Sequence, residues 1–164
     1  MLFRSLESSS IAKVLLQHPL QAILFSVSRR SVEMLLLRLM RWKDKVRSYR
    51  SGYLASERRQ IENDLREGNI SIVASTSALE LGIDIGGLDA VIINGYPGTI
   101  SGTRQEAGRA GRKGNTSLAI LVAGSNPLDQ YICTHPEYLW ENSPEHALID
   151  PNNTEILLDR KSVV

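Results

Sequence analysis

The sequence predicts an α/β domain in three layers, with a mainly parallel sheet between two layers of helices. Short, continuous apolar runs, which are typical of buried strands, alternate with segments whose apolar residues recur at helical spacing. Strand–helix alternation of this kind implies right-handed crossovers and helices on both faces of the sheet. At 164 residues, the chain is long enough for one well-cored domain.

Five runs have the length and composition of strands. They stop at polar residues or at glycine, and we predict strands at 21–26, 45–49, 70–75, 89–94 and 117–123. Because ligands of such sheets collect at the carboxyl ends of the strands, the segments that follow the first four runs should line one edge of the domain.

The segments between the strands have helical periodicity. We predict helices at 29–42, 57–67, 77–81, 102–110 and 127–132. Ser28 and Ser56 are expected to cap the first two, Gly68 to end the second, and Asn126 with a following proline to open the last. The first helix should turn these residues inward: Val32, Leu35, Leu36, Leu39 and Met40.

Composition changes toward both ends of the chain. We assign 1–19 to a peripheral helix or linker, 20–124 to the α/β domain, and 125–164 to a helical extension that leads to a further domain. In the extension, the segment HPEYLW should bury its large side chains against this domain or against one outside the chain. An exposed Trp140 would favour the second alternative.

The overall composition excludes several classes of protein. A net charge of +1 does not suit bulk electrostatic coating of a polyanion, so any polyanion site must be local. A single cysteine, Cys133, leaves no internal disulfide or cysteine-cluster zinc site, and we predict no metal site. No apolar run approaches the roughly 18 to 20 residues of a membrane span, so we expect a cytoplasmic protein.

The segment QEAGRAGRK, at 105–113, concentrates arginine and glycine. Arg109 and Arg112 are three residues apart, and on a helix or its frayed end this spacing aims both guanidiniums the same way. Gly108 and Gly111 remove side-chain bulk, so that a phosphate chain or another domain can come close. The planar, permanently charged guanidinium is well suited to phosphate oxygens. A solvated helix face is the alternative interpretation of these charges.

Two of these segments resemble motifs of a known family. STSALELGID (75–84) and QEAGRAGR (105–112) resemble motifs V and VI of the superfamily-two helicases, and LFSVSRR (24–30) resembles their motif IV. From YRSGYL at 49–54 onward, the sequence is most similar to the RecQ-like DNA repair helicases of the MrfA type, which carry a cysteine-rich C-terminal domain. The resemblance implies the C-terminal RecA-like lobe of a helicase.

The resemblance implies a nucleotide-facing group of residues. Arg112 falls on the arginine finger of motif VI, and Arg109 on its partner facing the nucleotide phosphates. Gln105 matches the position that couples nucleotide and strand, while Gly82 and Asp84 match the nucleotide and interdomain side of motif V. From the residues alone, Asp84 could equally cap a turn.

The resemblance also implies a nucleic-acid-facing group. Thr76 and Ser28 match hydroxyls that contact phosphate, although both could be helix caps alone. Arg50 stands where many RecQ-like proteins have histidine. Glu106 departs from relatives with arginine or glutamine, which leaves its contacts open. Tyr49, Tyr53 and Tyr96 could stack on bases or serve in packing.

The chain contains neither a phosphate loop of the form G-x-x-x-x-G-K-[ST] nor an Asp-Glu box for magnesium. In this family those parts belong to a first lobe, which would bind most of the ATP and Mg²⁺. We therefore expect this lobe to be inactive in ATP hydrolysis by itself, with DNA and the first lobe as partners. The alternatives are a non-catalytic module that binds nucleic acid or protein, and a lobe of an RNA helicase.

Overall fold

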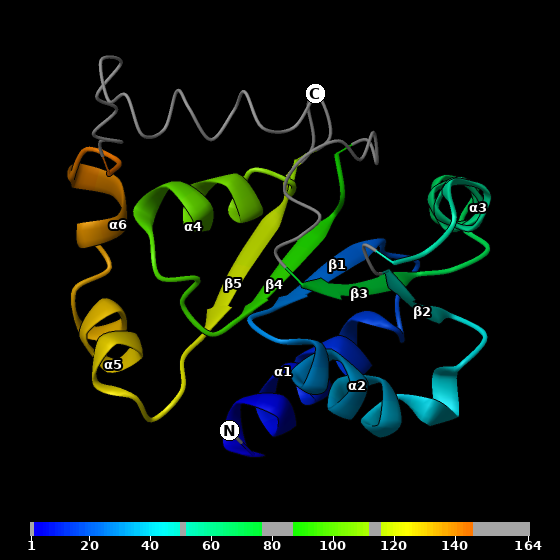
Figure 1. The fold of residues 1–164 in the computed structure, drawn as a ribbon, viewed down its shortest axis with the longest axis horizontal. Coiled ribbons are helices and arrows are strands. Elements are labelled where there is room, and N and C mark those ends of the chain that lie inside the picture. The colour runs from blue at the N-terminus through cyan, green and yellow to red at the C-terminus, as the bar shows by residue number, and fades with distance from the viewer. Residues whose placement is uncertain (1, 50–51, 77–86, 112–115, 146–164) are drawn as a thin grey trace, which may run out of the picture.

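The computed structural model describes residues 2–49, 52–76, 87–111 and 116–145 (Figure 1). These residues form a five-stranded sheet in the order β2-β3-β1-β4-β5, and each strand pair is parallel. The strands are β1 (Ala22–Ser26), β2 (Val46–Tyr49), β3 (Ile72–Thr76), β4 (Ala90–Asn94) and β5 (Leu118–Val122). The predicted α/β fold with a parallel sheet is confirmed.

Helices cover both faces of the sheet. They are α1 (Leu2–Leu15), α2 (Arg29–Arg38), α3 (Ala55–Arg66), α4 (Ile100–Ala107), α5 (Pro127–Thr134) and α6 (Tyr138–Glu141), with a 3-10 turn η1 at Met40–Trp42. Figure 1 shows α1 and α2 on one face, α3 and α4 on the other, and α5 and α6 beyond the β5 edge.

The core has two sides because side chains of a strand alternate between the faces of a sheet. Leu24 and Ile92 belong to the cluster beneath α1 and α2, whereas Phe25, Val73 and Val91 belong to the cluster on the α3–α4 side. Burial on both faces explains why these strands read as continuous apolar runs in the sequence.

The first helix is part of this core. Ala12 and Leu15 of α1 are buried in the cluster beneath α2, and the Ser8 hydroxyl donates a hydrogen bond to Asn94 Oδ1 at 2.9 Å. The segment expected to be peripheral thus covers one face of β1 and β4.

Several predicted helix boundaries were wrong. α2 stops at Arg38 and continues as the 3-10 turn, which leaves Met40 exposed instead of inward. α3 begins at Ala55, so Ser56 lies in its first turn and does not cap it. The Leu54 amide instead donates to the Glu57 carboxylate at 2.9 Å. The predicted helix at 77–81 lies outside the described residues.

The helix that carries the start of the arginine-rich segment also differs from its prediction. It begins at Ile100 and ends at Ala107, not at 102–110. The Thr99 side chain sets the start, because its Oγ1 accepts a hydrogen bond from the Gly102 amide at 3.0 Å. Among the described residues, no helix is long and apolar enough to cross a membrane.

Candidate functional site

The carboxyl ends of three neighbouring strands carry a row of polar residues. In the parallel register, Ser26 of β1 lies opposite both Thr76 of β3 and Asn94 of β4. Asn94 Nδ2 donates to Ser26 Oγ at 3.0 Å, and Ser8 in turn donates to the same amide side chain. This network fixes the edge of the sheet at which Thr76 and the loop to α2 lie.

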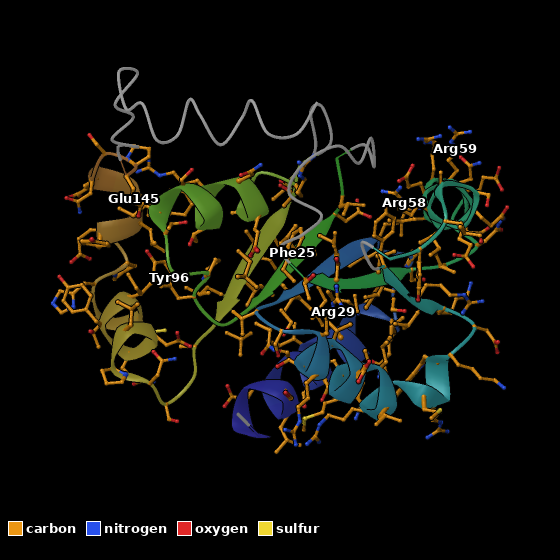
Figure 2. All side chains as sticks on the ribbon, in the orientation of Figure 1. Phe25, Arg29, Arg58, Arg59, Tyr96 and Glu145 are labelled. Carbon is orange, nitrogen blue, oxygen red and sulfur yellow. The ribbon has the colours of Figure 1, made fainter. Side chains whose placement is uncertain are left out.

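Ser28 lies at the same edge and caps α2. Its Oγ accepts a hydrogen bond from the Ser31 amide at 3.2 Å and lies 2.9 Å from the Ser31 hydroxyl. The predicted cap is therefore confirmed. Arg29, labelled in Figure 2, and Arg30 follow directly and are exposed. A helix N-terminus flanked by arginines is an environment that favours phosphate.

The arginine-rich segment is attached to the start of β4. The Leu88 amide donates to the Arg109 carbonyl at 3.1 Å, and the Gly111 amide donates to the Leu88 carbonyl at 2.9 Å. A parallel bridge joins Leu88 to Ala110. Gly111 has a φ of 127°, which side chains of L-residues rarely tolerate. The sequence therefore needs glycine at 111 to hold this segment against Leu88.

The predicted site residues that the structure describes do not form one cluster. Ser28 and Thr76 lie at the carboxyl edge of the sheet, as predicted for segments that follow the strands. Arg109 lies beside Leu88, before β4 begins, and is half-buried. Gln105 is half-buried in the last turn of α4. The remaining predicted residues, Gly82, Asp84, Arg112 and Arg50, lie outside the described part of the chain.

Glu106, whose contacts the sequence left open, is buried beneath α4. Only 3% of its surface is exposed, and it lines a cavity of about 70 Å³ together with Phe25, Ser26, Val27, Gly95 and Pro97. The cavity lies where β1 and β4 end and their loops leave in opposite directions, which is the usual ligand position in such sheets. Its volume suits a few water molecules and not a nucleotide. In the sequence, the spacing of Ile100, Thr103 and Glu106 places all three on one helix face, and this pattern could have indicated that Glu106 is buried.

Two further residues, which sequence reasoning did not select, hold α4 from outside. The Glu145 carboxylate accepts hydrogen bonds from the Ile100 amide at 2.6 Å and the Ser101 amide at 3.1 Å. These bonds at a helix N-terminus lower the pKa of Glu145. Arg104 donates to the carbonyls of Leu139, Trp140 and Asn142 at 2.7 to 3.0 Å. Both partners lie far along the chain, so no local pattern indicates them.

The tyrosines considered for base stacking are mainly packing residues. Tyr49 is buried and donates to Glu62 Oε1 at 2.8 Å, and burial together with this bond raises the pKa of Tyr49 to about 12. Tyr96 is buried between α4 and α5 (Figure 2), which raises its pKa as well. The Tyr53 hydroxyl lies 2.6 Å from the Ser48 hydroxyl and is half-buried.

A parallel five-stranded sheet, flanked by helices and carrying this arginine–glycine segment at the start of β4, defines a RecA-like α/β domain. The family model described as helicase conserved C-terminal domain matches residues 7–114, and the chain belongs to that family. The sequence resemblance to the C-terminal lobe of superfamily-two helicases is thereby confirmed.

Known relatives agree with this assignment. The chain is 48% identical over 93% of its length to "Uncharacterized ATP-dependent helicase YprA" of Bacillus subtilis, and 42% identical over 92% to "ATP-dependent helicase HRQ1" of Saccharomyces cerevisiae. The crystal structure of the DUF1998 helicase MrfA bound to DNA matches 96% of the chain with a TM-score of 0.89 and 46% identity. The same helicase bound to DNA and AMPPNP matches with a TM-score of 0.84 and 45% identity over 96% of the chain.

The chain spans only part of these proteins. It covers 21% of YprA, 15% of HRQ1 and 23% of the MrfA chain in each of the two structures. The activities of the relatives therefore describe proteins about four to seven times longer than this chain.

Proposed function

We propose that the chain is the C-terminal motor lobe of an ATP-dependent DNA helicase. In this role it supplies arginines to a nucleotide that is held mainly by another lobe, and it grips one DNA strand by its backbone. The fold, the family and the named activities of the relatives support this proposal. Residues 20–124 form the lobe proper, α1 covers one face, and 125–164 leads to a further domain.

The attachment of residues 109–111 to Leu88 carries the proposal. Residues 109–111 belong to the segment that resembles motif VI, and Leu88, to which they are bonded, follows the segment that resembles motif V by only four residues of sequence. A nucleotide-facing half-site needs these segments side by side. A solvated arginine face would need no such attachment.

The residues at this place fit the phosphate side of a nucleotide. Arg109 is half-buried, and its backbone carbonyl accepts a hydrogen bond from the Leu88 amide, which fixes its backbone position. A guanidinium binds phosphate oxygens through a planar fork of donors. Arg112 would be the finger that stabilises negative charge on the terminal phosphate, a role worth about 10³ to 10⁵ in rate in related enzymes. Gln105 would couple this site to the strand. Bound ATP and Mg²⁺ supply the phosphoryl group whose hydrolysis drives movement along DNA.

The carboxyl edge of the sheet is the proposed DNA side. Thr76 and the N-terminus of α2 lie there, and Ser28 begins that helix. Arg50 follows β2, whose carboxyl end lies at the same edge. Hydroxyls, arginines and a helix N-terminus contact phosphates without reading bases, as a moving motor requires. Because Arg109 lies before β4 begins, strand grip and nucleotide contact would use different sides of the lobe.

The proposal is tested in the full-length protein with Arg112→Ala and Arg109→Ala. The matched control is Arg59→Ala, since Arg59 is exposed on α3 and points away from the sheet (Figure 2). Steady-state ATPase with single-stranded DNA should fall about 10³-fold or more for Arg112→Ala, and unwinding should fall with it, while the control stays unchanged.

Three outcomes would contradict parts of the proposal. Unchanged unwinding in Arg112→Ala would refute the finger role and favour a non-catalytic binding module. ATPase stimulated by RNA and not by DNA would refute the DNA assignment. Hydrolysis of ATP by the purified 164-residue chain would refute the proposal that this lobe is inactive by itself.

The single, exposed Cys133 supports a reducing compartment such as the cytoplasm.

A further inference from the structure

The α5–α6 region carries an exposed apolar surface, which we call the aromatic face and define as Leu128, Tyr131, Tyr138 and Trp140. We propose that it is a docking surface for another domain of the same, longer protein, one that presents apolar side chains surrounded by lysine or arginine. The inference shares with the proposed function only the existence of a longer protein, and it concerns a surface away from the nucleotide and DNA residues.

The aromatic face is exposed and ordered by its own contacts. Trp140 is 61% exposed and Tyr131 is 46% exposed, although both are large and apolar. The Tyr131 ring stacks on His135 with centroids 4.4 Å apart, and it meets Tyr138 edge-on at 5.8 Å. Aromatic rings fixed in this way offer much contact area with little loss of side-chain freedom on binding.

This face is not needed to hold the extension on the lobe. Ile132 of α5 and Leu139 of α6 point inward and form a small cluster with Tyr96 and Ile100. Arg104 adds its hydrogen bonds to the carbonyls at the end of α6. The inner side of α5–α6 is thus already packed, and the aromatic face is a second apolar side.

The charge around the aromatic face excludes nucleic acid as the preferred occupant. Residues 126–145 contain four carboxylates and neither lysine nor arginine. Of the four, Asp129 and Glu145 bind backbone amides, while Glu137 and Glu141 are exposed beside the aromatic residues. Phosphates would be repelled here, whereas a protein surface with lysine or arginine at its rim would be attracted.

The opposite composition occurs along α2 and its connection to β2. Residues 29–47 contain seven lysines and arginines against two carboxylates. The lobe therefore has a basic side along α2 and its connection to β2, of which Arg29 and Arg30 lie at the proposed DNA edge, and an acidic, aromatic side at α5–α6 suited to protein. Because the charges of these segments partly cancel, the net charge of +1 does not reveal the difference between them.

The size of the face points to a tethered occupant. A stable interface between separate proteins takes about 800 Å² from each partner, and an aromatic side chain contributes roughly 150 to 250 Å² when fully buried. Four partly exposed side chains fall short of this, so a second copy or a free partner would be held weakly. A domain in the same chain has an effective concentration in the millimolar range, and a small face then suffices. Relatives that extend far beyond the matched part are consistent with such a domain.

The test is hydroxyl-radical footprinting of the full-length protein without nucleotide, read by mass spectrometry. Residues of the same type calibrate the rates: Trp42 is half-buried and Tyr96 is buried, so they are references for Trp140 and Tyr131. We expect oxidation of Trp140 and Tyr131 to be reduced to the level of these references, while exposed Met40 on the basic side stays reactive. In the full-length Trp140→Ala variant, protection of Tyr131 should be lost, whereas Leu37→Ala, another exposed apolar position, should leave it unchanged.

Each other outcome overturns the proposal. Trp140 and Tyr131 that are as reactive in the full-length protein as in the 164-residue chain would show an uncovered face. Protection that appears only after adding single-stranded DNA would identify a nucleic-acid platform. Protection that depends on protein concentration would identify a second copy. None of these readouts involves ATP hydrolysis, so they do not depend on whether Arg112 acts as an arginine finger.

Discussion

Gly111 provides the sharpest test of how the arginine-rich segment is held. Its φ of 127° lies in the region that L side chains rarely adopt, and its amide donates to Leu88. A Cβ at this position would meet only Ser117 Oγ at 3.6 Å, so space is not the obstacle. Gly111→Ala should therefore cost backbone strain of about 1 to 3 kcal/mol. The strain can be relieved only by releasing residues 109–111 from Leu88.

Two glycines serve as matched controls. Gly68 has a φ of 78°, and a Cβ added there would meet only Gln21 Nε2 at 3.9 Å, so Gly68→Ala should cost a similar strain away from α4 and the arginine-rich segment. Gly52 has open space and no φ in that region, so Gly52→Ala should be neutral or stabilising by about 0.4 to 1 kcal/mol. Urea unfolding of the 164-residue chain measures all three.

The same variants in the full-length protein separate strain from function. Gly111→Ala should lower DNA-stimulated ATPase far more than Gly68→Ala does at equal loss of stability, because it moves the segment that bears Arg109. Equal ATPase in the two variants would refute the reasoning. Equal stability of Gly111→Ala and Gly52→Ala would refute the strain itself.

Three other predictions concern stability. Ile132→Ala should cost about 2 to 5 kcal/mol in urea unfolding, because it empties a fully buried site under α5; a cost below 1 kcal/mol would mean that the extension is not docked. Glu145→Gln should destabilise the chain near neutral pH. Because hydrogen bonds lower the folded pKa of Glu145 from 4.5, the stability it adds is present above that value and is lost as the pH falls through the lowered pKa. Thermal unfolding should show the two proteins converging in acid. Tyr49 has a pKa raised from 10.0 to about 12, so stability should fall as the pH rises across that interval, and Tyr49→Phe should remove this part of the alkaline loss.

The sheet was predictable from sequence because its strands are buried on both faces. Each then reads as an uninterrupted apolar run, and predicted strands such as 89–94 differ from the observed Ala90–Asn94 by a single residue. The caps at Ser28 and Asn126 were predictable for a related reason, since a cap is a contact across only a few residues.

Contacts between distant segments were not predictable in this way. Glu145 reaches Ile100, and Arg104 reaches the end of α6, across more than 30 residues of sequence. Neither end of these bonds carries a pattern of its own. The same limit applies to Arg109, whose place at the start of β4 depends on where α4 ends and on the conformation of Gly111.

The two ties on α4 make that helix a short rigid lever. Glu145 and Arg104 hold its side toward the extension, and its last turn carries Gln105 and leads to Arg109. Eight residues span only about 12 Å, and a helix of that length does not bend appreciably. A displacement of the extension by an ångström at Ile100 therefore reaches Gln105 almost undiminished. The extension therefore has a direct mechanical route to the arginine-rich segment.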